Sequence, residues 1–345
     1  MNGSWAGHAV QHLRHRVATT AEQVGDRFPL HADSAGTWTS TRRGSWTGGF
    51  WAGLLGLRAA ATGAETDRAR ARAAWEALAQ WRDADTACRG MIFWYGGLAA
   101  RRENTGWEPL RAAALSLAAD LDPDLGAVPW GTAFGHSRGG LRVDGVAGLV
   151  PLLAWAGEPE VARQHLRSHL HRCFAGGAVQ PALFTSDGGR TWQPADDPAP
   201  GSSRAHAWLL LGCADGAHWL GAEFLEPAVA LARAWSDRFG HGVPPADADL
   251  PGGPVDTSAA AIAAVSFLKL AGNTGRQDWW RDGAALLHRA VDAGLVRSGP
   301  ARGALGSGCY DAKSGIAPAN ELIWGDFFCA VGLGLITGDL PVDDP

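Results

Sequence analysis

Apolar residues recur at intervals of three and four positions along most of the chain, whereas alternating runs of β-branched residues are scarce. The first pattern places apolar side chains on one face of an α-helix, and the second would be typical of a strand. We therefore predict an all-α chain. About twelve helices are expected, at residues 4–24, 47–62, 66–83, 90–102, 107–120, 143–156, 158–173, 203–217, 222–238, 257–272, 277–294 and 321–337.

Short and long connections alternate between these predicted helices. Glycine-containing breaks at 62–64, 156–159 and 273–275 are short, which implies antiparallel neighbouring helices. Longer loops are expected at 25–46, 121–142, 174–202, 239–256 and 295–320. If the helices pair into hairpins, the long loops collect on one rim of the molecule, and a functional site is expected there.

The length of the chain bears on how these helices are organised. A chain of 345 residues, 46% of them hydrophobic, can bury a large core and is long for a single domain unless the architecture is cyclic or repetitive. No Pro/Gly/Ser linker separates two self-sufficient halves. We predict one domain over residues 1–345, a closed α/α barrel; two separate helical bundles are the alternative.

Charge and cysteine content exclude several classes of protein. With a net charge of -5 and 19% charged residues, no basic surface is expected that could hold a nucleic-acid backbone. Apolar runs are interrupted before the length of about 18 residues that a membrane span needs, and the N-terminus lacks the apolar region of a signal peptide. The five cysteines are widely spaced and indicate neither a disulfide framework nor a zinc site. A cytoplasmic protein without membrane or nucleic-acid partners is expected.

Tryptophan is unusually abundant, with 17 Trp and only 2 Tyr. A flat ring with a polar edge can stack on the face of a sugar, or it can fill a wide helical core. Trp46 is expected at the loop end of a Trp/Gly-rich block and is a candidate for sugar stacking, whereas Trp51 and Trp324 are expected in the core. Because glycine is unfavourable in a helix, the repeated glycines beside these tryptophans predict either close approach between helices or a backbone that must leave room for another group.

Asp144 stands at the start of a predicted apolar helix, after a glycine-rich approach. One interpretation is a helix N-cap, in which the carboxylate accepts backbone N–H groups of the first turn. The other is a carboxyl group presented to a pocket near Trp130 and Trp155, where it could donate a proton. The sequence at this point leaves both open.

Arg204, His206 and Trp208 occupy alternate positions at the opening of another predicted helix. If the backbone there has not yet adopted a helical repeat, all three could reach one cavity. A guanidinium fork, an imidazole and an indole would together suit an anionic sugar. The alternative is an N-cap serine followed by an exposed polar turn.

Six segments, in order along the chain, resemble the signature blocks of the unsaturated glucuronyl hydrolases, glycoside hydrolase family 88. They are WTGGFWAGLLGL (46–57), RGMIFWYG (89–96), VDGVAGLVPLLAWA (143–156), SRAHAWLLLG (203–212), DTSAAAIAA (256–264) and ELIWGDFFCAVGL (321–333). The blocks extend from about residue 40 to 337. The neighbouring unsaturated rhamnogalacturonyl hydrolases share the fold and some of these blocks.

This resemblance implies a six-hairpin α/α barrel that hydrates a C4=C5 unsaturated uronic acid at the non-reducing end of a small saccharide, with no metal or cofactor. By position, Asp144 matches the general acid/base of the family. Trp46 and Trp130 match aromatic residues that line the sugar subsite, and Arg204 and Trp208 match its R-x-Q-x-W segment.

The chain departs from the family pattern in three places. The family's His-Asp pair reads Ala87-Cys88 here, so that its second carboxylate is replaced, and Asp83 or Asp85 is a candidate substitute. The family's substrate-contacting His falls on Gln180, and the Gln of R-x-Q-x-W is His206. We therefore expect a changed pocket. The predicted substrate-binding residues are Trp46, Cys88, Arg89, Trp130, Gln180, Arg204, His206 and Trp208.

Three functional hypotheses follow. The first is a hydrolase of unsaturated uronyl saccharides that uses Asp144. The second is the same barrel used to hydrate or isomerise an enol ether in a biosynthetic intermediate, suggested by the three departures. The third is a sugar-binding protein without catalytic activity.

Overall fold

The computed structural model describes residues 4–104, 106–134, 140–185 and 191–342. The described residues form thirteen α-helices and only short strands, so the predicted all-α class is confirmed. One predicted helix, 90–102, is divided at Gly97 into two. The helices are α1 (Ser4–Val24), α2 (Gly48–Thr62), α3 (Glu65–Ala77), α4 (Arg89–Gly96), α5 (Leu98–Glu103), α6 (Glu108–Ala119), α7 (Leu149–Trp155), α8 (Pro159–Cys173), α9 (Ser203–Trp219), α10 (Leu225–Phe239), α11 (Thr257–Thr274), α12 (Gln277–Gly294) and α13 (Ile323–Thr337).

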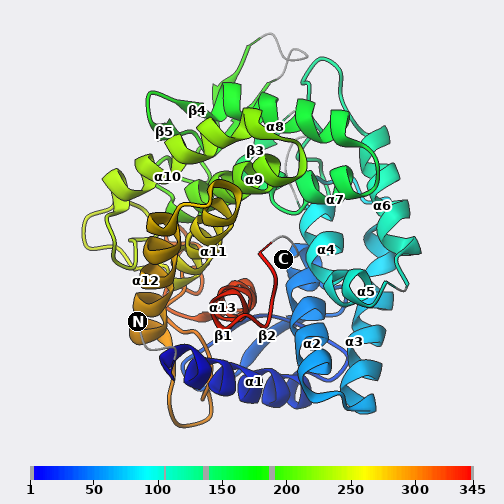
Figure 1. Ribbon diagram of the computed structural model, residues 1–345, viewed down its shortest axis with the longest axis vertical. Helices are drawn as coiled ribbons and strands as arrows, with labels where there is room; N and C mark the ends of the chain where they lie inside the picture. The colour runs from blue at the N-terminus through cyan, green and yellow to red at the C-terminus, as the bar shows by residue number, and fades with distance from the viewer. Residues whose placement is uncertain (1–3, 105, 135–139, 186–190, 343–345) are drawn as a thin grey trace.

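Six of the helices form a closed inner ring (Figure 1). Contacts run in the order α2, α4, α7, α9, α11 and α13, and α13 packs against α2 to close the ring. The outer helices α3, α6, α8, α10, α12 and α1 pack on these inner helices in the same order. This is the expected toroid of six helical hairpins, with the first and last parts of the chain joined in one ring.

The sequences of the helices explain their layers. The inner helix α11 is buried at every position from Thr257 to Ala271, because apolar and small residues cover all its sides except at Lys269. The outer helix α12 buries only one face. Glycines allow the inner helices to approach closely: a Cβ on Gly49 would lie 2.4 Å from the carbonyl oxygen of Ile92 on α4. The predicted close approach is confirmed, and Trp51 and Trp324 lie in the core.

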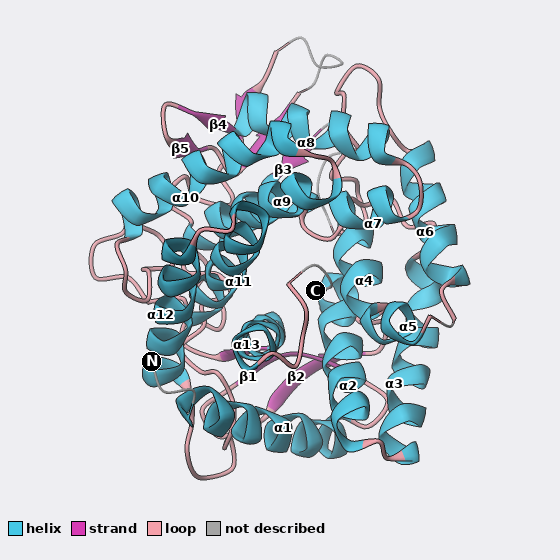
Figure 2. Cartoon of the chain, viewed as in Figure 1, coloured by secondary structure: helices cyan, strands magenta, loops and turns pink. Residues whose placement is uncertain are grey.

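Short strands, which the sequence did not predict, decorate the long loops (Figure 2). Strand β1 (Phe28–Ala32) pairs antiparallel with β2 (Trp38–Thr41) and with β8 (Glu321–Leu322). The other strands are β3 (Gly140–Arg142), β6 (Ala182–Phe184) and β7 (Gln193–Pro194) in one sheet and β4 (Phe174–Ala175) with β5 (Ala178–Val179) in another. The sequence did not indicate these strands because runs of two to five residues are too short to show an alternating pattern. In addition, β1 pairs with β8, which lies almost 300 residues later in the sequence.

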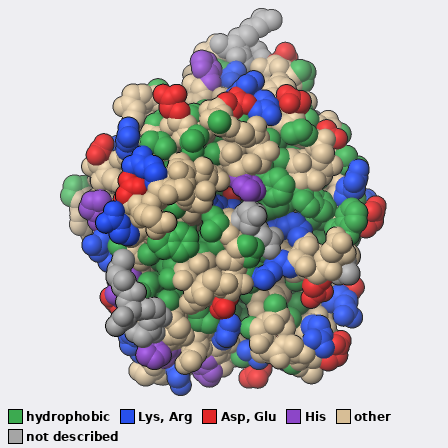
Figure 3. Space-filling view, in the orientation of Figure 1, with side chains coloured by type: hydrophobic (Ala, Val, Ile, Leu, Met, Phe, Trp, Pro, Cys, Tyr) green, Lys and Arg blue, Asp and Glu red, His purple; other side chains and the backbone are tan. Residues whose placement is uncertain are grey.

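The surface seen in Figure 3 carries acidic and basic side chains side by side, without a large field of one sign. In the described part of the chain, no helix has both the length and the apolar character needed to cross a membrane.

Candidate active site

A pocket of about 340 Å³ opens where the inner helices α2, α4 and α9 begin. Four of the five predicted long loops, 25–46, 121–142, 174–202 and 295–320, contribute to its wall. The lining residues are Ser45, Trp46, Cys88, Met91, Trp130, Phe134, Arg142, Asp144, Asp197, Arg204, Tyr310 and Asp311. The loops therefore collect on one rim, as the alternation of short and long connections predicted.

Asp144 lies in a single turn of 3-10 helix, Val143–Val146, and not at the N-cap of the helix that follows. Helix α7 starts only at Leu149, because Ala147 is extended and Gly148, its N-cap, adopts a left-handed φ of 69°. The predicted helix 143–156 was therefore wrong in its first two turns. Pro151, which suits the first turn of a helix, is the sequence signal that could have placed the true start.

The Asp144 side chain lines the pocket and keeps 17% of its surface exposed. Its Oδ2 atom is buried and accepts no hydrogen bond from the described residues. The Arg142 guanidinium is a neighbouring positive charge, with its Nε 3.5 Å from Oδ2. The N-cap interpretation is thus replaced by the second one: the carboxyl group borders a cavity, and its buried Oδ2 has unused hydrogen-bonding capacity.

Arg142 is a pocket residue that sequence reasoning missed. It ends strand β3, two positions before Asp144, and its guanidinium lies 4.9 Å from the centre of the Trp130 ring. Its Nη1 lies 3.3 Å from Oδ2 of Asp197. Arg142 stands only two positions from Asp144 in the sequence, and this closeness was a usable signal. Asp197 comes from a distant loop and carried no such signal.

Trp46 and Trp130 stand in the wall of the pocket, as predicted. The Trp46 ring lies 4.9 Å from that of Trp324 and 6.5 Å from that of Tyr310. Trp130 is held by its backbone: its N–H donates to the carbonyl of Gly140 at 2.8 Å. Two indoles thus border the cavity that contains the Asp144 carboxyl, an arrangement suited to the faces of a sugar ring.

Arg204 also lines the pocket, at the start of α9, where the Ser202 side chain caps the helix by accepting the N–H of Ala205 at 3.3 Å. Its guanidinium donates to the carbonyl oxygens of Cys309 and Tyr310, the latter at 2.7 Å, and to Asp256 at 3.3 Å. Arg204 therefore fixes the loop that brings Tyr310 and Asp311 to the pocket. These two residues, like Phe134, were not found from the sequence because the loop conformation alone places them there.

Cys88 lies in the pocket wall, at the position where the family resemblance implies a second carboxylate. Burial raises the pKa of its thiol to about 12, so the side chain is neutral near neutral pH. Neither proposed substitute lines the pocket: Asp83 pairs with Arg82 at 2.7 Å, and Asp85 accepts hydrogen bonds from the Thr132 backbone and hydroxyl.

Arg89 and Gln180, predicted to bind substrate, lie outside the pocket. The Arg89 guanidinium points away from the ring, where it contacts the Asp120 carboxylate and donates to Ser116 at 2.9 Å. Gln180 follows β5 and donates to the carbonyl of Ala182 at 3.0 Å, beside a different surface depression. Both side chains are occupied by the protein itself, which removes the basis for assigning them direct substrate contact.

His206 and Trp208 are also separated from the pocket, and the reason is helical geometry. Helix α9 is regular from Ser203, so residues two apart point in nearly opposite directions. His206 faces outward and shares a 2.9 Å hydrogen bond with the carbonyl of Leu231 on α10. Trp208 lies on the same side as Arg204 but one turn deeper, fully buried beside Phe328. Only Arg204 of the three reaches the cavity.

Comparisons with known proteins agree with this architecture. An unsaturated glucuronyl hydrolase of Bacillus sp. strain GL1 is 30% identical over an alignment 348 positions long, which covers 90% of this chain and 91% of the relative. The crystal structure of an unsaturated glucuronyl hydrolase from Bacillus sp. GL1 superimposes with a TM-score of 0.87 at 24% identity, over 95% of this chain and 96% of the other. A structure of UGL with dGlcA-Glc-Rha-Glc gives a TM-score of 0.85 at 25% identity, over 94% and 95%.

No family model matches the chain. The similarity to the Bacillus relative nevertheless extends over nearly the whole length of both proteins, and the ring of six helical hairpins is shared with the solved structures. By this identity and coverage, the chain belongs to the unsaturated glucuronyl hydrolases, which are glycoside hydrolases.

Proposed function

We propose that this chain hydrates the C4=C5 double bond of an unsaturated uronic acid at the non-reducing end of a small saccharide, with Asp144 as general acid and base. The observation that carries the proposal is the place of the Asp144 carboxyl: it lines the pocket near Trp46 and Trp130, and its Oδ2 accepts no hydrogen bond from the described residues. Family membership supports the reaction class.

The substrate is a vinyl ether, and one carboxyl group suffices for its hydration. Asp144 gives its proton to C4, and positive charge develops at C5 and the ring oxygen. A water molecule then adds to C5 while the Asp144 carboxylate accepts one of its protons, which restores the acid. The resulting hemiketal opens and expels the remaining sugar. An ordinary glycosidase instead places two carboxyl groups on either side of the bond that breaks.

Two arginines and three aspartates, Asp144 among them, border the pocket. Arg142 and Arg204 line the pocket from two segments that are far apart in the sequence. Guanidinium groups pair well with carboxylates. The carboxylates of Asp197 and Asp311 also border the cavity. We propose that the two arginines favour binding of the uronate and that the two tryptophans contact its ring and that of the next sugar.

The test is the Asp144→Asn variant, which keeps the shape of the side chain and removes the acid. We expect it to fold like the wild type and to lose at least about 100-fold in the rate at which absorbance of the double bond disappears. Turnover retained by this variant would refute the role of Asp144. Binding of an unsaturated disaccharide without turnover by the wild type, measured by calorimetry, would instead favour the hypothesis of a sugar-binding protein.

The neutral Cys88 thiol favours a second candidate, the same barrel acting on a different enol ether. With a thiol where the family resemblance implies a carboxylate, the pocket has one fewer negative charge. A panel of unsaturated disaccharides that differ in the second sugar, tested with wild type and Cys88→Asp, separates the two. Uniform inactivity of the wild type on the panel, with gain of activity in Cys88→Asp, would favour the altered substrate.

A further inference from the structure

A fully buried histidine on α8, His165, contacts the backbone of two segments that line the pocket, the one that carries Trp130 and the one that carries Asp144. His165 Nδ1 lies 3.1 Å from the backbone nitrogen of Val128, two residues before Trp130. Its Nε2 lies 3.3 Å from the carbonyl oxygen of Gly145, the residue after Asp144. His165 does not line the pocket, so its imidazole reaches the two segments without contacting the space where a substrate would lie.

The partners of the ring fix its tautomer. Because the Val128 N–H donates to Nδ1, that nitrogen must carry a lone pair, and the proton of a neutral ring is then on Nε2. Nε2–H can donate to the Gly145 carbonyl. Burial and the neighbouring His169 ring, 4.3 Å away, hold the pKa of His165 well below its ordinary value, so the ring keeps the acceptor and the donor near neutral pH.

The segment that carries Asp144 depends on such outside contacts. The 3-10 turn Val143–Val146 ends at the extended Ala147, so the Gly145 carbonyl does not join the hydrogen bonds of α7. Upstream, the Val143 N–H donates to the carbonyl of Pro181 at 2.9 Å. Asp144 in this segment also borders the pocket. If this short turn were held only at its ends, the Asp144 carboxyl could move relative to the Trp130 ring.

We propose that His165 is a positioning residue. Through its two backbone hydrogen bonds, it fixes the position of the Asp144 carboxyl relative to the Trp130 ring. The expected changes in kcat and KM rest on the proposed function. The two hydrogen bonds of the His165 ring do not depend on it. A displacement of the acid by a fraction of an ångström slows proton transfer, whereas a displaced indole weakens contact with the sugar.

Two substitutions separate the two bonds. Asn at 165 places an amide near Nδ1, where its oxygen can accept the Val128 N–H, and it loses the bond to Gly145. Gln reaches the Nε2 position, where its amide can donate to Gly145, and it loses the bond to Val128. We expect His165→Asn to lower kcat about tenfold or more with little change in KM. We expect His165→Gln to keep most of kcat and to raise KM.

The matched control is His206→Gln. This histidine is also buried and also bonds a backbone carbonyl, that of Leu231, but it lies away from the pocket. It is expected to lower the thermal midpoint with kcat and KM unchanged. Equal losses of kcat in His165→Asn and His165→Gln, or losses that follow only the thermal midpoint across all three variants, would overturn the positioning role.

A measurement on the wild type needs neither a folded variant nor a substrate. Nitrogen-15 NMR of the protein labelled at histidine reports the tautomer of each buried ring. A neutral Nε2–H form of His165 through the neutral pH range is expected, and an Nδ1–H form would overturn the proposal. If the wild type turned over no unsaturated uronide, the proposed function would fail, and the tautomer would still decide the bonding of His165.

Discussion

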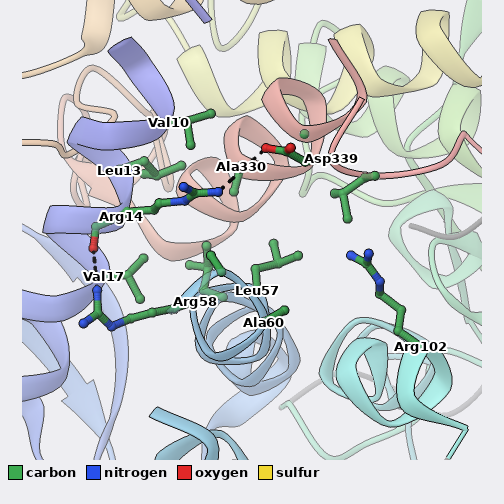
Figure 4. A pocket seen from close by; sticks show the side chains of 14 residues that line it. Val10, Leu13, Arg14, Val17, Leu57, Arg58, Ala60, Arg102, Ala330 and Asp339 are labelled. Carbon is green, nitrogen blue, oxygen red and sulfur yellow. Dashed lines mark hydrogen bonds and ion pairs between the residues drawn. The ribbon is translucent and has the colours of Figure 1, made fainter. Parts of the chain in front are cut away.

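The two ends of the inner ring each hold a cavity, and the charged side chains near the two cavities differ in how they are paired. The pocket at the helix beginnings, about 340 Å³, is bordered mainly by residues from long loops. The second cavity, about 260 Å³, is bordered by later turns of α2 and α13, by α1 and by residues after α13 (Figure 4). Its arginines are tied to nearby groups: Arg14 lies 3.7 Å from Asp339, and Arg58 donates to the carbonyl of Arg14 at 3.1 Å and to Asp67 at 3.0 Å.

Charges buried near this second end are also paired. Lys269 on α11 lies 2.5 Å from Asp215 on α9, and both residues stand in the later halves of their helices and are almost fully buried. At the first end, by contrast, the Asp144 carboxyl borders the pocket with 17% of its side chain exposed, and its contact with Arg142 is longer, at 3.5 Å between Oδ2 and Nε. The difference indicates that a carboxyl group that borders a cavity and is only loosely paired, more than the presence of charge or of a cavity, distinguishes the proposed active end of the ring.

The largest effect is expected from breaking the buried pair at the second end. Lys269→Met leaves the Asp215 carboxylate buried without its cation, and we expect a loss of about 3–5 kcal/mol in the free energy of unfolding, measured with urea. The double variant Asp215→Leu with Lys269→Met should recover most of this loss. In the folded fraction, kcat should remain that of the wild type. A fall in kcat larger than the fall in folded fraction would show that this pair also serves the active end.

A smaller effect is expected from the tryptophan wall at the first end. Trp46→Leu removes the flat ring and should lower kcat/KM for an unsaturated disaccharide about tenfold, which corresponds to about 1.4 kcal/mol. Trp46→Phe, which retains an aromatic face, should lose less. Both variants are compared by initial rates and by thermal midpoint, because Trp46 also packs on Trp324. Equal activity of the Leu and Phe variants would argue against stacking by this residue.

The smallest effect is expected at the arginines of the second cavity. Arg58→Ala removes a partly exposed ion pair with Asp67 and should cost about 0.5–1 kcal/mol of unfolding free energy, less at high salt. Arg58→Lys, which keeps the charge, is the matched comparison. Steady-state kinetics of both variants should equal those of the wild type. A specific change in KM would mean that the two ends of the ring are coupled, and the contrast between them would have to be revised.

Helix positions were largely predictable, whereas their irregularities were not. The periodicity of α1, α8 and α12 is local and was found to within a residue or two. The break at Ala147 and Gly148 was missed because an apolar run obscured it. Gly148 must be a glycine for tertiary reasons: its φ is positive, and a Cβ there would lie 2.6 Å from the carbonyl oxygen of Gly90 on α4.

Part of the candidate site could be predicted from residue type and from resemblance to the family. Asp144, Trp46, Trp130, Cys88 and Arg204 all border one pocket, as proposed from the sequence. Arg89, Gln180, His206 and Trp208 do not, because the direction of a side chain depends on where a helix begins and on which neighbour binds it first. Asp197, Tyr310 and Asp311 reach the pocket through the conformation of long loops, which no local sequence pattern predicts.

The sequence alone determined the helical class, the alternation of short turns and long loops, and the resemblance that identifies the family, because each of these depends on residues close together along the chain. The tertiary structure decided which charges are paired and which face a cavity. That outcome depends on contacts between residues far apart, such as His165 with Val128 and Gly145, and on the water that their packing excludes.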